Sequence, residues 1–412
     1  MPRSALVVGG GPAGASAALG LARSGLEVTL VEQRTTWRGR ICGGFLCPEA
    51  VGELEKLGLL DRIRDAGATG IENVSVTFPS GSPIAVDVRR GGQAGLMVDR
   101  RALEEALLDA VREAGITVEM GTTASAIHGD GDRWVVSLRD ARDRTSRRRF
   151  TLVVLADGCY TLARDAATKP RRGWFGWSAS FSGVRQNPGT LTLHAFPGGY
   201  VGLQTCSGEV TSVSGVTWHS RGQTRPWQAE FDEVLERSKP LRNALYGSTR
   251  AEEWRGGGPV PFRHHLRWTG GPVAVGDAAA VSDPFTGDGL ARALSAGSML
   301  ARSIAEAGSP ASAVVGRAHA KLWNARYSKR LSGGRWIREL LKAAPVFKAS
   351  EVFLFRRSSF LENLAATFLV APDRAPLPPP APARAAVAHA AAGAARPAAG
   401  PLPGSSPELG IS

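Results

Sequence analysis

Three glycines near the start of the chain have the spacing of a phosphate-binding turn. Gly9, Gly11 and Gly14 form GxGxxG between an apolar run, residues 3–8, and an Ala-rich segment, residues 12–24. The first glycine permits a tight turn, the second lets a pyrophosphate approach the backbone, and the third lets helix and strand pack closely. The free N–H groups at the start of such a helix attract phosphate. The spacing therefore predicts a nucleotide phosphate site.

A carboxylate ends the next apolar run, residues 26–32. Glu32 follows Gly14 by 18 residues, where a carboxylate can accept hydrogen bonds from ribose hydroxyls. The order of these elements, a strand, a turn, a helix, a second strand and an acidic residue, predicts a binding site for an adenine dinucleotide. A glycine-rich turn without a ligand is the minor alternative. The pattern does not say which dinucleotide binds.

Two later segments each place an Asp and a Gly after an apolar strand. Asp157-Gly158 ends VVLADG, and Gly276-Asp277 ends AVGD and leads into the loop DPFTGDG. Helix capping explains either aspartate alone, but not both together with GxGxxG. In their order and separations, the three motifs resemble those of flavoproteins with the p-hydroxybenzoate hydroxylase-like fold. The resemblance covers about residues 3–330.

The resemblance implies FAD as the cofactor. By position, Asp277 would bind its ribityl or pyrophosphate region, Asp157-Gly158 would lie near the pyrophosphate, and Arg100 would contact FAD. The backbone of residues 287–290 would face the flavin ring and favour negative charge on it. The predicted cofactor-binding residues are Gly9, Gly11, Pro12, Ala13, Gly14, Glu32, Gln33, Arg34, Cys42, Gly43, Arg100, Asp157, Gly158, Gly276, Asp277, Pro284, Gly287, Asp288, Gly289 and Leu290.

Two stretches indicate a branch of this group. ICGGFLCPEA, residues 41–50, and DPFTGDGLARALSAG, residues 283–297, resemble the geranylgeranyl reductase-like branch. Cys42 is thereby a candidate site residue, with a small buried residue in a tight turn as the equal alternative. Flavin halogenases of this fold carry WxWxIP, whereas GWFGWSASF, residues 173–181, lacks Ile-Pro. We therefore expect its aromatics to pack against the flavin domain or to line an apolar pocket.

The elements that must position these residues predict an α/β (α+β) fold, in which a Rossmann-like FAD-binding domain carries an inserted antiparallel-sheet substrate domain and C-terminal helices. A turn at PSGSP predicts a hairpin over 72–88, and 173–219 is strand-like. Helices are expected over 12–24, 49–57, 101–115, 226–246, 287–306, 311–329 and 335–369. The predicted domains are 1–70, 93–170 and 271–330 for FAD; 71–92 and 171–270 for substrate; 331–371 as a helical extension; and 372–412 as a disordered Ala- and Pro-rich tail.

The amino-acid composition limits the classes of ligand and partner that the protein is expected to bind. The net charge of +13 comes mainly from arginines, which suit anionic cofactors, acidic substrates or lipid headgroups. No motif or basic stripe with aromatics predicts nucleic-acid binding, and the seven histidines lack metal-ligand spacing. No segment approaches the roughly 20 apolar residues of a membrane span, and no secretory pattern begins the chain. We expect a cytoplasmic protein with four reduced cysteines; residues 336–370 either pack on the core or rest on a membrane surface.

The sequence motifs specify the reaction less closely than they specify the cofactor. We expect an FAD-dependent oxidoreductase, and favour a monooxygenase of an apolar, phenolic or polyketide-like metabolite using NAD(P)H and O2. No second GxGxxG provides a nicotinamide domain, so NAD(P)H would visit transiently, or a partner protein or quinol would deliver electrons. The alternatives are C=C reduction in prenyl lipids, and a non-catalytic FAD-binding redox or interaction module. No general base stands out: His194, His219 and Tyr200 lie in the expected substrate sheet.

Overall fold

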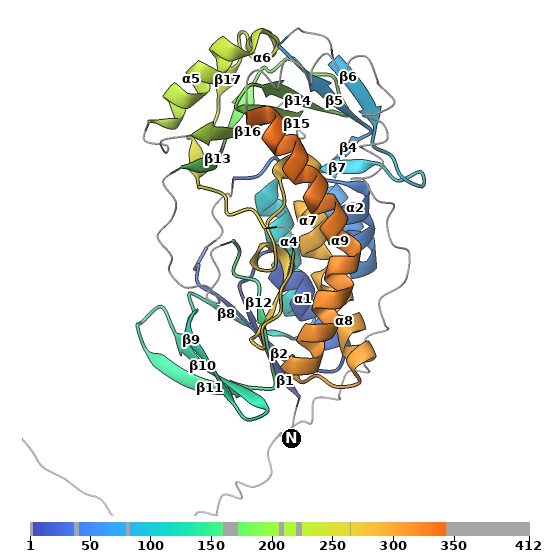
Figure 1. Ribbon diagram of the computed structural model, residues 1–412, viewed down its shortest axis with the longest axis vertical. Helices are drawn as coiled ribbons and strands as arrows, with labels where there is room; N and C mark the ends of the chain where they lie inside the picture. Colours follow the sequence, from blue (N-terminus) through green and yellow to red (C-terminus); the bar gives the residue numbers. More distant parts are fainter. Residues whose placement is uncertain are drawn as a thin grey trace, which may run out of the picture.

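The computed structural model describes residues 3–36, 41–79, 83–159, 172–205, 210–219, 225–263 and 265–342. A parallel sheet with its helices forms one part of the molecule, and a large, mainly antiparallel sheet lies at the other end (Figure 1). The predicted α/β (α+β) fold is confirmed. Cys206, the helical extension beyond residue 342 and the tail 372–412 lie outside the described residues, and the domain boundaries stay a prediction.

The parallel sheet carries the N-terminal glycine motif. Its strand order is β19-β12-β1-β2-β8, and every neighbouring pair is parallel. Ala5 and Val7 of β1 pack in the main core, whereas Leu6 and Val8 pack in a second cluster. Burial on both faces explains the continuous apolar run. The strands are β1 (Ser4–Val8), β2 (Glu27–Glu32), β8 (Thr117–Met120), β12 (Leu152–Leu155) and β19 (Val273–Ala274).

Helices pack on one face of this sheet and a small antiparallel sheet packs on the other. An added Cβ at Gly20 of α1 would lie 2.4 Å from the carbonyl oxygen of Gly297 in α8, so the two helices touch through their backbones. On the other face, Val136 and Leu138 pack against Leu6. The helices are α1 (Pro12–Arg23), α4 (Arg100–Glu113) and α8 (Ala296–Ala307); the strands are β9 (Thr123–Asp130), which was not predicted, β10 (Arg133–Arg139) and β11 (Thr145–Phe150).

The second large sheet has the order β17-β13-β16-β15-β14-β5-β6, with β18 beside β13. The predicted hairpin over 72–88 is confirmed as β5 and β6, and β5 joins β14 in parallel. Trp177 and Phe231 pack where α5 covers the sheet. The elements are β5 (Asn73–Thr77), β6 (Pro83–Asp87), β13 (Gly173–Ser182), β14 (Thr190–Phe196), β15 (Gly199–Thr205), β16 (Val210–His219), α5 (Trp227–Arg237), α6 (Lys239–Ala244), β17 (Thr249–Arg250) and β18 (Arg255–Gly257).

Short elements connect the two large sheets. A three-stranded sheet, β3-β7-β4, lies next to α2, and two 3-10 turns precede α7. The helix predicted over 287–306 is interrupted at Ser295, which caps α7 and begins α8. The elements are β3 (Phe45–Leu46), α2 (Pro48–Leu57), α3 (Leu60–Asp65), β4 (Thr69–Ile71), β7 (Gly95–Met97), η1 (Gly276–Ala278), η2 (Pro284–Thr286) and α7 (Gly289–Leu294).

One long helix, α9 (Ser312–Lys342), replaces the two helices predicted over 311–329 and from 335 onward. The helix continues through the gap between the two predicted ranges, and Gly334 in that gap packs on the η2 loop: an added Cβ would lie 2.9 Å from Thr286 Cγ2. In Figure 1, α9 runs from beside α8 to the edge of the second large sheet. There the N–H of Gly198 donates to the carbonyl oxygen of Leu341 at 2.7 Å.

Candidate active site

The glycine motif forms a turn in which side chains have no room. Gly9 has a φ of +104°, and an added Cβ would lie 2.5 Å from the carbonyl oxygen of Ala156. At Gly14 an added Cβ would lie 1.8 Å from the carbonyl oxygen of Gly9. Gly11 caps α1 in an extended conformation, with Pro12 in the first turn. The turn therefore presents the start of α1 as an open cradle.

Glu32 is held at the end of β2 by the backbone around it. Only 3% of Glu32 is exposed; its Oε2 accepts from the N–H of Gly10 at 2.7 Å and its Oε1 from the N–H of Arg34 at 3.0 Å. A carboxylate oxygen can accept more than one hydrogen bond, so each retains acceptor capacity for a ribose. Arg34 Nη1 is buried without a hydrogen-bond partner. Gln33 is exposed.

A cavity of about 610 Å³ runs from this cradle to the second large sheet. Twelve of the predicted cofactor-binding residues line it; Gly9, Gly14, Glu32, Gln33, Arg34, Asp157, Gly276 and Asp288 do not. The Asp288 carboxylate instead accepts from the hydroxyl of Thr286, which does line the cavity, at 2.7 Å. The twelve are Gly11, Pro12, Ala13, Cys42, Gly43, Arg100, Gly158, Asp277, Pro284, Gly287, Gly289 and Leu290.

An unpredicted arginine holds the loop after β19. Arg292 is 2% exposed and borders the cavity. Its guanidinium donates to the Ala280 carbonyl at 2.8 Å and to the Ser282 hydroxyl at 2.6 Å, and lies 3.7 Å from Asp277 Oδ1. A buried cation needs such partners. The sequence signal was an arginine within the small, apolar segment GLARAL.

Cys42 differs from Cys47 in its surroundings. The Cys42 sulfur lies on the cavity wall, accepts from the N–H of Gly44 at 3.3 Å, and is 3.7 Å from Arg100 Nη1. Cys47 is buried at the start of α2, away from the cavity, and burial first, then Glu49, raises its pKa to about 12. Of these two thiols only Cys42 borders the cavity, which Cys159 also lines.

The opposite cavity wall comes from the second large sheet. Tyr200, Gly202 and Gln204 alternate along β15 and share the face toward the cavity. The wall around them is mainly aliphatic: Val74 and Val76 of β5, Val86 of β6, Leu191 and Leu193 of β14, and Val216 of β16, with Ser214 as a further polar residue.

Tyr200 joins this wall to the DPFTGDG loop. Its hydroxyl donates to Asp283 Oδ1 at 3.3 Å, and its ring meets Phe285 edge-on at 5.4 Å between centroids. Asp283 also accepts from the N–H of Phe285 at 3.0 Å and lies 3.8 Å from Arg338 of α9. Burial raises the pKa of Asp283 to about 6. Burial, and secondarily Asp283, raises the pKa of Tyr200 well above its usual value.

The other side chains singled out in the sheet are placed differently. Neither His194 nor His219 lines the cavity. His219 Nε2 lies 3.3 Å from Glu230 of α5, and His194 is buried, which lowers its pKa to about 4. Trp177 does border the cavity, whereas Trp174 and Phe175 do not. In the described part of the chain, no group of three potential metal ligands occurs.

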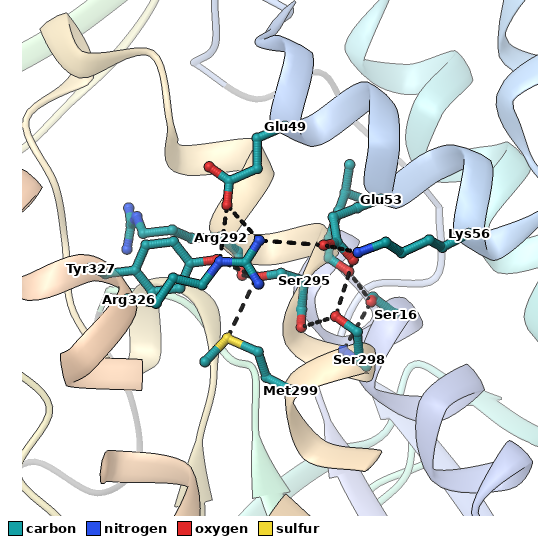
Figure 2. A network of polar contacts seen from close by, with 12 residues as sticks. Ser16, Glu49, Glu53, Lys56, Arg292, Ser295, Ser298, Met299, Arg326 and Tyr327 are labelled. Atoms are coloured by element: carbon teal, nitrogen blue, oxygen red, sulfur yellow. Dashed lines mark hydrogen bonds and ion pairs between the residues drawn. The ribbon is translucent and has the colours of Figure 1, made fainter. Parts of the chain in front are cut away.

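Buried charges behind the site hold α2 against α9. Glu49, 1% exposed, accepts from Arg326 Nη2 at 2.7 Å and from Arg330 Nη1 at 2.8 Å. One turn further along α2, Glu53 accepts from the Ser298 hydroxyl of α8 at 3.0 Å. Figure 2 shows Glu49 and Glu53 pointing from α2 toward Arg326 and Ser298. The network fixes α2, which directly follows the Cys42 segment.

The residues present fit FAD. Gly9 and Gly14 leave no room for a Cβ against the backbone that closes the turn, the Glu32 carboxylate ends β2, and the unpartnered Arg34 Nη1 suits an acceptor on the nucleotide. Asp277, Gly287 and Gly289 line the cavity and stay the predicted contacts for the remainder of the cofactor. A Rossmann-like parallel sheet, such a cradle and a cavity covered by a second sheet define the class of FAD-dependent oxidoreductases.

The chain belongs to the FAD binding domain family, which it matches over residues 3–314. It is 28% identical over 391 residues to menaquinone reductase of Mycobacterium tuberculosis, covering 87% of this chain and 89% of that protein. It is 29% identical over 376 residues to digeranylgeranylglycerophospholipid reductase 1 of Methanopyrus kandleri, covering 87% and 94%. A geranylgeranyl bacteriochlorophyll reductase-like structure from Thermoplasma acidophilum superposes with a TM-score of 0.70 at 19% identity, covering 91% and 94%.

The family match confirms FAD as the cofactor, and the relative at 29% identity supports the predicted resemblance to the geranylgeranyl reductase-like branch. They do not decide between reduction and oxygenation. No helix in the described ranges is long and apolar enough to cross a membrane.

Proposed function

We propose that the protein is an FAD-dependent reductase of C=C bonds in an apolar, prenyl-type chain. The observation that carries the proposal is the cavity, which continues from the FAD cradle onto an aliphatic wall. Such a wall suits a hydrocarbon chain and excludes water. The two curated relatives described above are named as reductases, and each match spans 87% of this chain.

The titratable groups around the cavity also suit reduction. Those that line it are Cys42, Arg100, Cys159, Tyr200, Asp277 and Arg292. Among the described lining residues, the second large sheet contributes neither a carboxylate nor a histidine. A phenol hydroxylase would use such a base to ionise its substrate. Saturation of a double bond needs a proton donor, which a thiol or a hydroxyl can be.

Reduced FAD supplies the hydride for one carbon of the double bond. In this proposal the Cys42 thiol delivers a proton to the other carbon and recovers one from solvent. Arg100, 3.7 Å from the sulfur, stabilises the thiolate left behind. The Tyr200 hydroxyl is less suited, because its proton is already directed at Asp283. NAD(P)H or an electron-transfer protein re-reduces the cofactor between cycles.

The test is a single turnover without oxygen. FAD-loaded protein, reduced anaerobically, is mixed with a geranylgeranyl lipid, and the product is analysed by mass spectrometry. We expect two hydrogen atoms to be added per double bond. Cys42→Ala should lower the rate on the order of a hundredfold with FAD retained, whereas Cys47→Ala, off the cavity, should not. Absence of saturated product with every prenyl substrate would refute the proposal.

Oxygenation of a phenolic or polyketide-like ring is the second candidate. The observation that favours it is the pair of polar side chains, Gln204 and Ser214, in the otherwise aliphatic wall. They suit a hydroxylated ring. The same reduced protein mixed with O2 and a phenol would then yield a product with one added oxygen atom. If no reductant turns the bound flavin over with either substrate class, a non-catalytic redox or interaction module becomes the better explanation.

A further inference from the structure

We infer that Gln204 determines substrate specificity by hydrogen-bonding a hydroxyl group of the substrate. The substrate would then be amphipathic, with its hydroxyl near the cofactor loops and an apolar chain along the aliphatic wall. This inference rests on the proposed role of the cavity as the substrate site. It adds a hydroxyl group, and the residue that binds it, to the prenyl-type substrate of the first proposed reaction.

The Gln204 amide is buried and lacks a partner. Gln204 is 5% exposed, lines the cavity, and its Oε1 has no hydrogen-bond partner. Most buried polar side-chain atoms in proteins are hydrogen-bonded, because leaving one unpaired destabilises the fold. The amide could have been replaced by an aliphatic side chain like those of the neighbouring strands. Gln204 lines the cavity, so a ligand that seats against the amide can supply the missing donor, whereas the equally unpaired Oε1 of Gln186 belongs to a residue off the cavity.

The amide lies at the cofactor end of the wall. It packs directly on Gly43: an added Cβ there would be 2.6 Å from Gln204 Nε2 and 2.8 Å from its Oε1. Gly43 is thus a glycine that makes room for this amide. Its chain neighbour Cys42 carries the thiol of the proposed proton transfer, so the Gln204 contact would fix the reacting end of a substrate.

The surroundings select the class of ligand. The lining residues that β5, β6 and β13–β16 contribute carry no charged side chain. A neutral hydroxyl fits this setting better than an anionic headgroup, whose charge would stay uncompensated on that wall. Gly202 lies between Tyr200 and Gln204 on the same face, and an added Cβ there would be 3.4 Å from Gln204 Nε2, so the amide packs over a residue without a side chain. An amide can accept from a hydroxyl and donate to it.

The test compares two probes that differ only in the donor. 4-Geranylphenol and its methyl ether are titrated into the oxidised, FAD-loaded protein, and the flavin spectrum reports binding without turnover. We expect the phenol to bind about tenfold more tightly, the factor that one ordinary hydrogen bond supplies. Gln204→Met, similar in shape, should abolish this preference while leaving ether binding unchanged.

Gln186→Met is the matched control. Gln186 is a half-buried glutamine off the cavity whose Nε2 donates to the Leu203 carbonyl at 2.9 Å, and its replacement should preserve the tenfold preference. Equal affinities for both probes in the wild type, or an undiminished preference in Gln204→Met, would overturn the inference. If that variant does not retain FAD, Gln204→Asn, whose shorter amide cannot reach, takes its place.

The two proposals fail differently. If the reaction is assigned wrongly, reduced protein leaves the geranyl double bonds intact, yet the oxidised protein still prefers the phenol. If the Gln204 inference is wrong, the preference is absent although saturation proceeds.

Discussion

Single atoms decide whether the nucleotide cradle forms. We expect Gly14→Ala to lower FAD affinity at least about tenfold, because its Cβ would lie 1.8 Å from the Gly9 carbonyl oxygen and push α1 away from the turn. Flavin absorbance per polypeptide after gel filtration measures the retained FAD. Gly70→Ala is the control, since an added Cβ there meets nothing within 4 Å. Full FAD occupancy in Gly14→Ala would show that the turn can relax.

Individual site residues were predictable where local sequence fixes them. The backbone at Gly11 and Gly287 must adopt a particular conformation, and the sequence motifs around these glycines predict that conformation. Gln204 was not predictable, because its role depends on the register of β15 and on contact with Gly43, about 160 residues earlier in the chain. Arg292 was missed because its partners, Ala280 and Ser282, become neighbours only after the loop folds back.

At the scale of elements, α9 shows why the helix boundary was predicted wrongly. Glycine ends many helices because it lowers helix propensity. The local pattern could not show that Gly334 meets Thr286 of η2, where the missing side chain permits close packing. By contrast, the hairpin of β5 and β6 was predictable because turn and alternation are both local signals.

Glu49 is the carboxylate of α2 that pairs with both Arg326 and Arg330 of α9, while Glu53 lies 3.6 Å from Arg326 alone. Glu49→Gln would remove the anion that these two arginines share, and breaking a buried pair from one side is strongly destabilising. We expect the free energy of unfolding to fall by about 3 kcal/mol, measured by urea denaturation of the FAD-loaded protein. Glu113→Gln is the control, because its partner Arg62 is 41% exposed. We expect this substitution to change the free energy of unfolding by less than about 1 kcal/mol. Equal effects would contradict the assignment.

At the scale of the whole molecule, we expect acid to lower the free energy of unfolding through the protonation of buried histidines. Burial lowers the pKa of His194 and of His319 to about 4. Between pH 6.5 and 4 the unfolded chain therefore binds more protons at these residues, and stability falls as pH falls. Asp283, with its raised pKa, acts in the opposite direction and offsets part of this loss.

Between pH 7 and pH 5 we expect a net loss of roughly 2–3 kcal/mol in the free energy of unfolding, of which each histidine contributes about 2 kcal/mol before the Asp283 offset. Urea denaturation at both pH values measures it. His194→Leu should remove most of the difference. The same drop in that variant would mean that other groups govern acid stability.

The length of α9 determines how far the second large sheet lies from α2 across the cavity. The helix is fastened to α2 through Arg326 and Arg330 and, three turns later, to the second large sheet at Leu341, where Lys342 also lies 4.1 Å from the Trp218 ring centroid. The helix thus sets the distance between α2, on the FAD side of the cavity, and the second large sheet on the opposite side. One inserted residue would lengthen it by about 1.5 Å and rotate its end by about 100°. Natural changes in this gap should therefore come in whole helical turns, or by side-chain size on β15.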